Sequence, residues 1–230
     1  PTPVQAAAIP PAIAGEDLYI IAQTGSGKTA AYVLPILQRL LEDDGKPVAP
    51  RALILSPTRE LAQQIHKDIQ DLARFTFLKS ELVIGGEDFK VQAAKLRKNP
   101  DIIIATPGRT LEQLGAGGLD LSQVQTLVID EADRMLDMGF SEDVLTIAQA
   151  CPTERQTMLF SATTGNTGLK RIIEQVLREP RWLELDSVRD DTPAIRQQVI
   201  AVDDNAHREA LTKWLLLNEC QGKAIVFTNT

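Results

Sequence analysis

The sequence predicts an α/β fold of three layers, with helices on both faces of a mostly parallel central sheet. Three observations support this prediction. Six short apolar runs recur along the chain, helical patterns separate them, and polar or glycine-rich segments follow them. When strands alternate with helices in this way, right-handed crossovers connect the strands and make them parallel.

Each apolar run is continuous rather than alternating between apolar and polar residues. A strand with one face in water would alternate, so we expect these strands to be covered on both faces. The predicted strands span residues 18–22, 52–56, 81–84, 101–105, 126–130 and 157–162.

The segment between the second and third predicted strands has a clear helical pattern. Leu61, Ile65, Ile69 and Leu72 are separated by four, four and three residues, which places them on one face of a helix. Thr58 is suited to cap the amino terminus of that helix through its hydroxyl.

The segments that follow the predicted strands hold the residues suited to chemistry. In chain order they read QTGSGKT, PTRE, GG, TPGR, DEAD and SAT. The carboxyl ends of parallel strands meet at one edge of a sheet, where ligands of open α/β folds bind. The sequence therefore predicts that these segments share one binding edge.

The character of the sequence changes near residue 186. Residues 1–186 are expected to form one α/β domain, 187–194 a linker, and 195–230 the truncated start of a second α/β domain. This last part predicts strands at 197–202 and 223–228 around a helix at 205–219, too little to bury a three-layer core. The chain also begins without methionine, so we expect it to be a fragment.

Composition argues against several classes of protein. The net charge is −7 and the pI about 5.0, which disfavours a domain that holds nucleic acid by bulk positive charge. No apolar run is long enough to span a membrane, and no signal peptide is present, so no membrane partner is expected. Cys151 and Cys220 fit no metal-ligand spacing, as expected for reduced thiols of a cytoplasmic protein.

The segment after the first predicted strand fits a phosphate-binding P-loop. Backbone N–H groups of residues 25–28 can surround a β-phosphate at a helix start. Lys28 would reach the β- and γ-phosphates, and the Thr29 hydroxyl would hold Mg²⁺. Ala22 stands where the usual pattern has its first glycine, and the alternative is a glycine turn with a chance lysine. The predicted nucleotide-binding residues here are Thr24, Gly25, Ser26, Gly27, Lys28 and Thr29.

Two acidic residues after the fifth predicted strand would complete a nucleotide site. Asp130 ends a buried strand and suits Mg²⁺ coordination, and Glu131 can orient or deprotonate an attacking water. The alternative is an acidic start of a helix, which favours the helix dipole. Gln5 has an amide that can read adenine, although a polar residue on a surface helix is its ordinary explanation.

Three further segments could form a track for a phosphodiester backbone. PTREL at 57–61, GG at 85–86 and TPGR at 106–109 are each explained singly as caps and turns. Together, on one edge, they resemble a row of helix N-termini and arginines facing phosphates. The hydroxyls of SAT at 161–163 could hydrogen-bond to Asp133 and link this track to the nucleotide.

In their order and rough spacing, these motifs resemble those of the DEAD-box RNA helicases. PTPVQ, AQTGSGKT, PTREL, GG, TPGR, DEAD, SAT and VFTNT extend from Pro1 to Thr230, and DEADRMLDMGF is similar to bacterial members. The resemblance implies a RecA-like P-loop NTPase domain that binds ATP, Mg²⁺ and single-stranded RNA. It also implies a full-length protein that couples ATP hydrolysis to local RNA unwinding.

The resemblance implies roles for individual residues as well. Gln5 is similar to the family's adenine-reading glutamine. The catalytic residues would be Lys28, Asp130 and Glu131, and the Mg²⁺ ligands Thr29 and Asp130. The RNA-backbone contacts would be Pro57, Thr58, Arg59, Gly86, Thr106, Gly108 and Arg109. The residues that couple hydrolysis to strand separation would be Asp133, Ser161 and Thr163.

Two features of the family lie outside this sequence. An aromatic residue upstream of the glutamine stacks on adenine in the family, and the second RecA-like domain carries arginine fingers, worth roughly 10³–10⁵ in rate. We therefore expect this chain alone to be nearly inactive and its missing second domain to be a partner. Two other hypotheses remain: an ATP-dependent RNA clamp or assembly scaffold with little unwinding, and a DNA translocase of the same superfamily, which DEAD and PTPVQ disfavour.

Overall fold

The computed structural model describes the chain except for residues 44, 46–47, 165–166, 186–197, 221 and 229–230. The chain divides into two compact units, residues 1–187 and 188–230, and each is described by itself. Among the described residues, no helix is long and apolar enough to cross a membrane.

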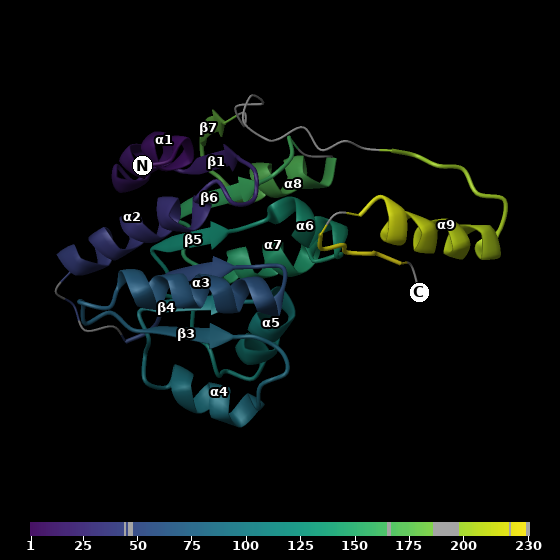
Figure 1. Cartoon of the computed structure of the whole chain (residues 1–230). Coiled ribbons are helices and arrows are strands. Elements are labelled where there is room, and N and C mark those ends of the chain that lie inside the picture. The colour runs from purple at the N-terminus through teal and green to yellow at the C-terminus, as the bar shows by residue number, and fades with distance from the viewer. Residues whose placement is uncertain (44, 46–47, 165–166, 186–197, 221, 229–230) are drawn as a thin grey trace. The chain divides into compact units, whose positions relative to one another are not determined.

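The first unit is built on a parallel sheet, which in the described residues has seven strands in the order β3-β4-β2-β5-β6-β1-β7 (Figure 1). Each pairing between neighbouring strands is parallel, which confirms the predicted sheet. The strands are β1 (Leu18–Ile21), β2 (Ala52–Leu55), β3 (Ser80–Val83), β4 (Ile102–Ala105), β5 (Thr126–Ile129), β6 (Gln156–Ser161) and β7 (Arg181–Glu184).

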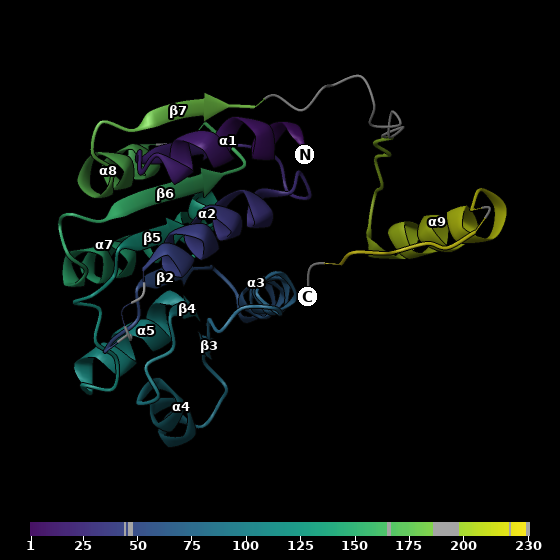
Figure 2. The ribbon, with the colours of Figure 1, turned by 90° about the vertical axis from the view of Figure 1, so that its left-hand side faces the viewer.

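Helices cover both faces of this sheet, so the predicted three layers are confirmed (Figure 2). On one face the apolar core contains side chains of α1 (Pro3–Ile13), α2 (Lys28–Glu42) and α3 (Arg59–Leu72). The other face packs against α4 (Phe89–Leu96), α5 (Pro107–Gly115), α6 (Ala132–Asp137), α7 (Ser141–Ala150) and α8 (Thr167–Val176).

Strand β1 shows why the apolar runs are continuous. Leu18 and Ile20 belong to the core under α1–α3, whereas Tyr19 between them belongs to the core on the other face. All three side chains are fully buried. Because successive strand residues point to opposite faces, a strand covered on both sides has no position for a solvated residue.

The helix expected at 59–72 is present as α3. The Thr58 hydroxyl accepts a hydrogen bond from Leu61 N at 3.3 Å, which confirms the predicted cap. Ile65 and Ile69 are buried, whereas Leu72 at the end of the helix is 42% exposed. The apolar face thus leaves the core in its last turn.

Two stretches of the second unit correct the sequence analysis. Residues 198–202 and 223–228 are mostly apolar, but neither forms a strand in the structure. A strand needs a neighbour for its backbone hydrogen bonds, and no strand pairs with either stretch among the described residues. Helix α9 (Asn205–Asn218) does form, capped by Asp204. The predicted linker, 187–194, lies outside the described residues.

Candidate nucleotide and nucleic-acid sites

The predicted P-loop lies between the end of β1 and the start of α2. Gly25 and Gly27 have φ angles of 84° and 91°, in the left-handed region that glycine adopts without strain. The buried Lys28 is the first residue of α2, and its amine donates a hydrogen bond to the Ala22 carbonyl at 3.0 Å. The loop therefore ends at a helix N-terminus, where backbone N–H groups and the helix dipole favour an anion.

Gln5 contacts the P-loop directly. Its Oε1 accepts from Thr2 N at 3.0 Å, and its Nε2 donates to the Gly27 carbonyl at 3.2 Å. The first contact is half of a capping box at the start of α1. The amide is thus held in place by the loop that it was predicted to serve, and each of its polar atoms keeps further hydrogen-bonding capacity.

Asp130 follows β5 and is held from two sides. Tyr32 donates its hydroxyl proton to Oδ2 at 3.0 Å, and the Glu131 N–H donates to Oδ1 at 2.9 Å. Burial raises the pKa of Asp130, while the charge of Lys28 and the hydrogen bond from Tyr32 oppose that rise. Burial and then the Asp130 charge raise the pKa of Tyr32 well above its ordinary value.

Tyr32 also connects the two residues predicted to hold Mg²⁺. Its hydroxyl donates to Asp130, and Thr29 is near enough to lower the pKa of that hydroxyl. Lys28 is near enough to lower the pKa of Asp130. The structure therefore brings together Lys28, Thr29 and Asp130 from two loops that lie about a hundred residues apart in sequence.

Glu131 lies at the turn from β5 into α6. Its backbone has φ 49° and ψ 51°, a left-handed conformation that costs a non-glycine residue energy. Its side chain, 13% exposed, forms an ion pair with Arg134 at 3.1 Å. To orient a water in catalysis, the Glu131 carboxylate would have to break this ion pair with Arg134 or bind the water in addition to it.

The segment after β6 contacts the DEAD segment. Asp133 Oδ2 accepts hydrogen bonds from Ala162 N and from Thr163 Oγ1, each at 3.1 Å, as expected for Thr163. Ser161 does not reach Asp133, and its hydroxyl donates to the Thr163 carbonyl at 2.8 Å. The expectation that both hydroxyls bond to Asp133 is wrong for Ser161, because the buried end of β6 turns that hydroxyl into its own loop.

A separate cleft of about 460 Å³ brings together most of the predicted RNA contacts. Arg59 is exposed, with its guanidinium against Gly85 and Gly86, and no hydrogen bond or ion pair is found for it in the described part of the chain. Gly86 itself does not line the cleft, but Arg59 packs against it. The predicted residues that line it are Pro57, Thr58, Arg59, Thr106, Gly108 and Arg109.

Arg109 differs from Arg59 in being engaged within the protein. It donates to the Glu87 carbonyl at 3.1 Å and contacts the Glu112 carboxylate at 2.7 Å. Sequence reasoning also missed two apolar residues of this cleft, Met138 and Phe140. Met138 is 48% exposed, which only the structure shows, because the sequence alone favours a packing role for a methionine in this segment.

Comparison with known proteins identifies the family. The model of the DEAD/DEAH box helicase family matches residues 2–172, which is most of the chain. The chain belongs to the DEAD/DEAH box helicase family. This helicase-family chain is 44% identical over 235 residues to the probable ATP-dependent RNA helicase ddx27 of Dictyostelium discoideum, an alignment that covers 99% of this chain and 29% of that protein.

Two further comparisons agree. The helicase-family chain is 42% identical over 228 residues to the ATP-dependent RNA helicase SrmB of Escherichia coli, covering 99% of this chain and 51% of SrmB. A crystal structure of a hypothetical ATP-dependent RNA helicase from Sulfolobus tokodaii matches with a TM-score of 0.72 and 36% identity, over 80% of this chain and 52% of that one. The chain has the RecA-like helicase fold and spans at most about half the length of these relatives.

Proposed function

We propose that the protein containing this chain is an ATP-dependent RNA helicase that couples ATP hydrolysis to local unwinding of RNA. One observation carries this proposal: Lys28, Thr29 and Asp130 converge around Tyr32 at the helix N-terminus that ends the P-loop. A cation, a hydroxyl and a carboxylate in that arrangement suit a triphosphate and its metal. We further propose a cytoplasmic location, which the two free thiols support.

The residues present fit Mg²⁺ bound together with ATP. Among the described residues, no group of three His, Cys, Asp or Glu side chains could hold a metal alone. Mg²⁺ is commonly held by one or two carboxylates, phosphate oxygens and water, and Thr29 and Asp130 would supply the protein's oxygens. When bound, the ion would neutralise charge on the phosphates.

The protein's own groups would then act on the nucleotide. Lys28 would exchange its hydrogen bond with the Ala22 carbonyl for phosphate oxygens, and Glu131 would orient the attacking water. Gln5 would read adenine with the N–H and lone pair that its contacts leave unused. Asp133 and Thr163, already hydrogen-bonded, would transmit the state of the nucleotide to the RNA cleft.

Nucleotide binding by the chain tests the P-loop assignment. We expect Mg²⁺–ADP and Mg²⁺–ATP to bind weakly, and Lys28→Ala to weaken binding about tenfold or more, since a charge-assisted hydrogen bond contributes roughly 1.5–3 kcal/mol. Fluorescence titration with a labelled ADP measures this. Lys170→Ala, an exposed lysine of α8, is the matched control. Equal binding by Lys28→Ala and the parent chain would refute the assignment.

The full-length protein tests the helicase assignment. We expect its ATPase activity to rise with single-stranded RNA and to change little with DNA of the same sequence and length. Equal stimulation by DNA would favour a translocase on DNA. If GTP competed as well as ATP, the assignment of Gln5 as the residue that reads adenine would be refuted.

A second candidate function is an RNA clamp that holds RNA while ATP is bound. The same cleft residues would serve it, and Arg59, with its unused guanidinium, suits a phosphate contact in both cases. Strand release from a short duplex, measured beside ATP-dependent retention of single-stranded RNA, separates the two. Retention without release would support the clamp.

A further inference from the structure

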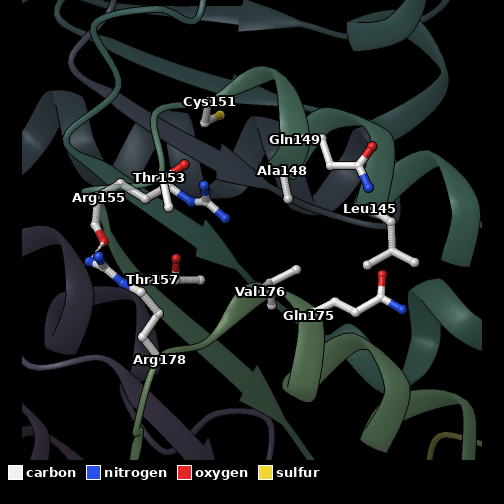
Figure 3. A pocket seen from close by; sticks show the side chains of 10 residues that line it. All are labelled: Leu145, Ala148, Gln149, Cys151, Thr153, Arg155, Thr157, Gln175, Val176 and Arg178. Carbon is white, nitrogen blue, oxygen red and sulfur yellow. Dashed lines mark hydrogen bonds between the residues drawn. The ribbon is translucent and has the colours of Figure 1, made fainter.

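A cavity of about 250 Å³ lies where β6 begins, at the amino ends of the strands, whereas the P-loop follows the carboxyl end of β1. Figure 3 shows the side chains that line this cavity. It is bounded by the end of α7, the first residues of β6 and the end of α8. None of the residues assigned to nucleotide or RNA lines it. Its polar groups are therefore not accounted for by the proposed helicase function.

The Thr157 hydroxyl has no hydrogen-bond partner in the described part of the structure. The residue is 1% exposed, and its Oγ1 is fully buried. Figure 3 shows this hydroxyl on the side of the cavity that faces Arg155. A buried hydroxyl without a partner costs roughly 1–3 kcal/mol, so a ligand that accepts its proton would remove an existing penalty.

Arg155 contributes to the same cavity a guanidinium that forms no direct ion pair within the described part of the chain. It is 8% exposed, its Nη1 donates to the Pro152 carbonyl at 2.8 Å, and its buried Nε has no partner among the described residues. No ion pair to its guanidinium is found there either. Burial lowers the pKa of Arg155 and the charge of Asp17 opposes that change, but the Asp17 carboxylate does not bond to this guanidinium. Its two oxygens accept hydrogen bonds from the backbone N–H groups of Thr157 and Arg178, each at 2.8 Å.

The other titratable groups of the cavity add no second free charge. The Arg178 guanidinium is paired with Glu154 at 3.0 Å and donates to the Arg155 carbonyl at 2.7 Å. Burial raises the pKa of the Cys151 thiol to about 11, so it stays neutral near pH 7 and contacts the Ile147 carbonyl. One guanidinium, that of Arg155, therefore faces the cavity without a direct ion pair to any described residue.

The remaining lining has an apolar wall and a few polar side chains, among them that of Thr153. Leu145, Ala148 and Val176 line the cavity, with the amides of Gln149 and Gln175 further along it. Drug-sized ligands occupy roughly 300–1,000 Å³, so this cavity suits something smaller.

We propose that this cavity binds a carboxylate that carries a short apolar chain. The unused Nε and Nη2 edge of Arg155 matches the two oxygens of a carboxylate, which arginine binds through parallel N–H groups. The Thr157 hydroxyl donates to the same carboxylate, and the apolar chain packs on Leu145, Ala148 and Val176. Both a free small acid and an acidic side chain of a partner peptide have this chemistry.

Titration of the isotope-labelled chain with butyrate tests the proposal. We expect saturable shifts of backbone amide signals at Ala148, Thr157 and Val176, and none of comparable size with butyramide, which has the same shape without the charge. Equal shifts with butyramide, or no saturable shift with butyrate, would overturn it.

Two variants and a control locate the binding. Arg155→Gln and Thr157→Val should each weaken butyrate binding, by about tenfold for the arginine. Thr157→Val keeps the shape of the side chain, and without ligand it should raise the urea midpoint because it removes an unpaired buried hydroxyl. Arg171→Gln changes an exposed arginine of α8 and should leave binding unchanged. Parent-like binding by both cavity variants would contradict the assignment, whatever the result for the helicase activity.

A pair of peptides distinguishes the two sources of the carboxylate. One has blocked ends and a single Glu side chain, and the other has Gln in its place. Tighter binding of the Glu peptide than of butyrate identifies an acidic side chain of a protein partner as the occupant. Binding no tighter than butyrate identifies a small free acid. Equal binding of the two peptides at the cavity would count against a carboxylate site.

Discussion

Glu131 combines a functional assignment with a backbone conformation that costs energy. Its φ of 49° lies in the left-handed region, which glycine adopts at lower energy than a residue with a β-carbon. We therefore expect Glu131→Gly to raise the free energy of unfolding by about 1 kcal/mol, while ATP hydrolysis by the full-length protein is largely lost. Urea denaturation and an ATPase assay measure the two effects.

Glu131→Gln is the matched control for that prediction. It keeps the β-carbon and the side-chain length, so it should lose hydrolysis without gaining stability. If both variants gained stability equally, the cost would come from the charge and not from the backbone.

Cys151 gives a prediction about pH. Burial raises the pKa of its thiol from 9.0 to about 11, so the folded chain holds this proton more tightly than the unfolded chain. Its contribution to stability is complete below pH 9 and falls as the pH rises from 9 to 11, by up to about 3 kcal/mol. We expect the stability difference between the parent chain and Cys151→Ala to shrink across that window, as measured by urea denaturation.

The same shift predicts how the thiol reacts. A rise of the pKa from 9.0 to about 11 lowers the fraction of thiolate about a hundredfold relative to an unfolded cysteine. The thiolate is the reactive form. Alkylation of Cys151 in the folded chain should therefore be slower by at least that factor than in urea. Mass spectrometry of the modified peptides measures the rates, and similar rates in both states would show that the thiol is accessible and unshifted.

At the scale of elements, the join between α1 and the P-loop depends on a glycine. A β-carbon on Gly27 would lie 2.7 Å from Gln5 Nε2, and the φ of Gly27 is 91°. We expect Gly27→Ala to destabilise the chain by roughly 1–3 kcal/mol and to displace Gln5. Gly108→Ala, where nothing lies within 4 Å of the new carbon, should be nearly neutral.

The double variant separates the two causes. Adding Gln5→Ala to Gly27→Ala removes the shortest steric contact but leaves those with Thr2 at 3.1 and 3.3 Å and the backbone cost, so stability should recover in part. Full recovery would assign the whole effect to the contact, and no recovery would assign it to the backbone. Because the two residues touch, their effects are not expected to add.

The sequence predicted six of the strands closely. One of them, β3, is the outermost strand on its side of the sheet and has only Val83 buried. In the other five, burial on both faces demands continuous apolar residues. Strand β7 was missed for the same reason: Arg181–Glu184 lies at the sheet edge, is largely exposed, and contains two charged residues. The strands expected at 197–202 and 223–228 are the opposite case, because there the sequence predicted strands that the structure does not form. They have apolar residues but no neighbouring strand, and strand pairing is a property of the fold that no short segment encodes.

The candidate site was predictable where chemistry demands particular residue types. Lys28 and Asp130 fall together as expected, whereas Tyr32 was not singled out. Tyr32 stands four residues after Lys28, which places both on one face of α2. The sequence therefore predicts that Tyr32 lies near the P-loop, but it does not predict the hydrogen bond with Asp130. The ion pair of Arg109 with Glu112 was also found only from the structure, since two charged residues at i and i+3 of a helix can pair but need not.

At the scale of the whole chain, the two units differ in what stabilises them. The first has buried cores on both faces of its sheet, whereas none of the 14 residues of α9 is buried. An isolated helix of that length is marginal in water because its nucleation is costly. We therefore expect two stabilities, with a cooperative transition for residues 1–187 and early, gradual melting of α9.

The two tryptophans allow this to be measured in one chain. Trp182 lies on β7 against the ring of Tyr19, and Trp214 lies on α9. With Trp214→Phe, fluorescence should follow a single sigmoidal urea transition. With Trp182→Phe, it should drift without one, while circular dichroism still shows the cooperative step. A shared midpoint in both variants would mean that α9 gains its stability from the first unit, because a helix without buried residues has no other source of cooperativity.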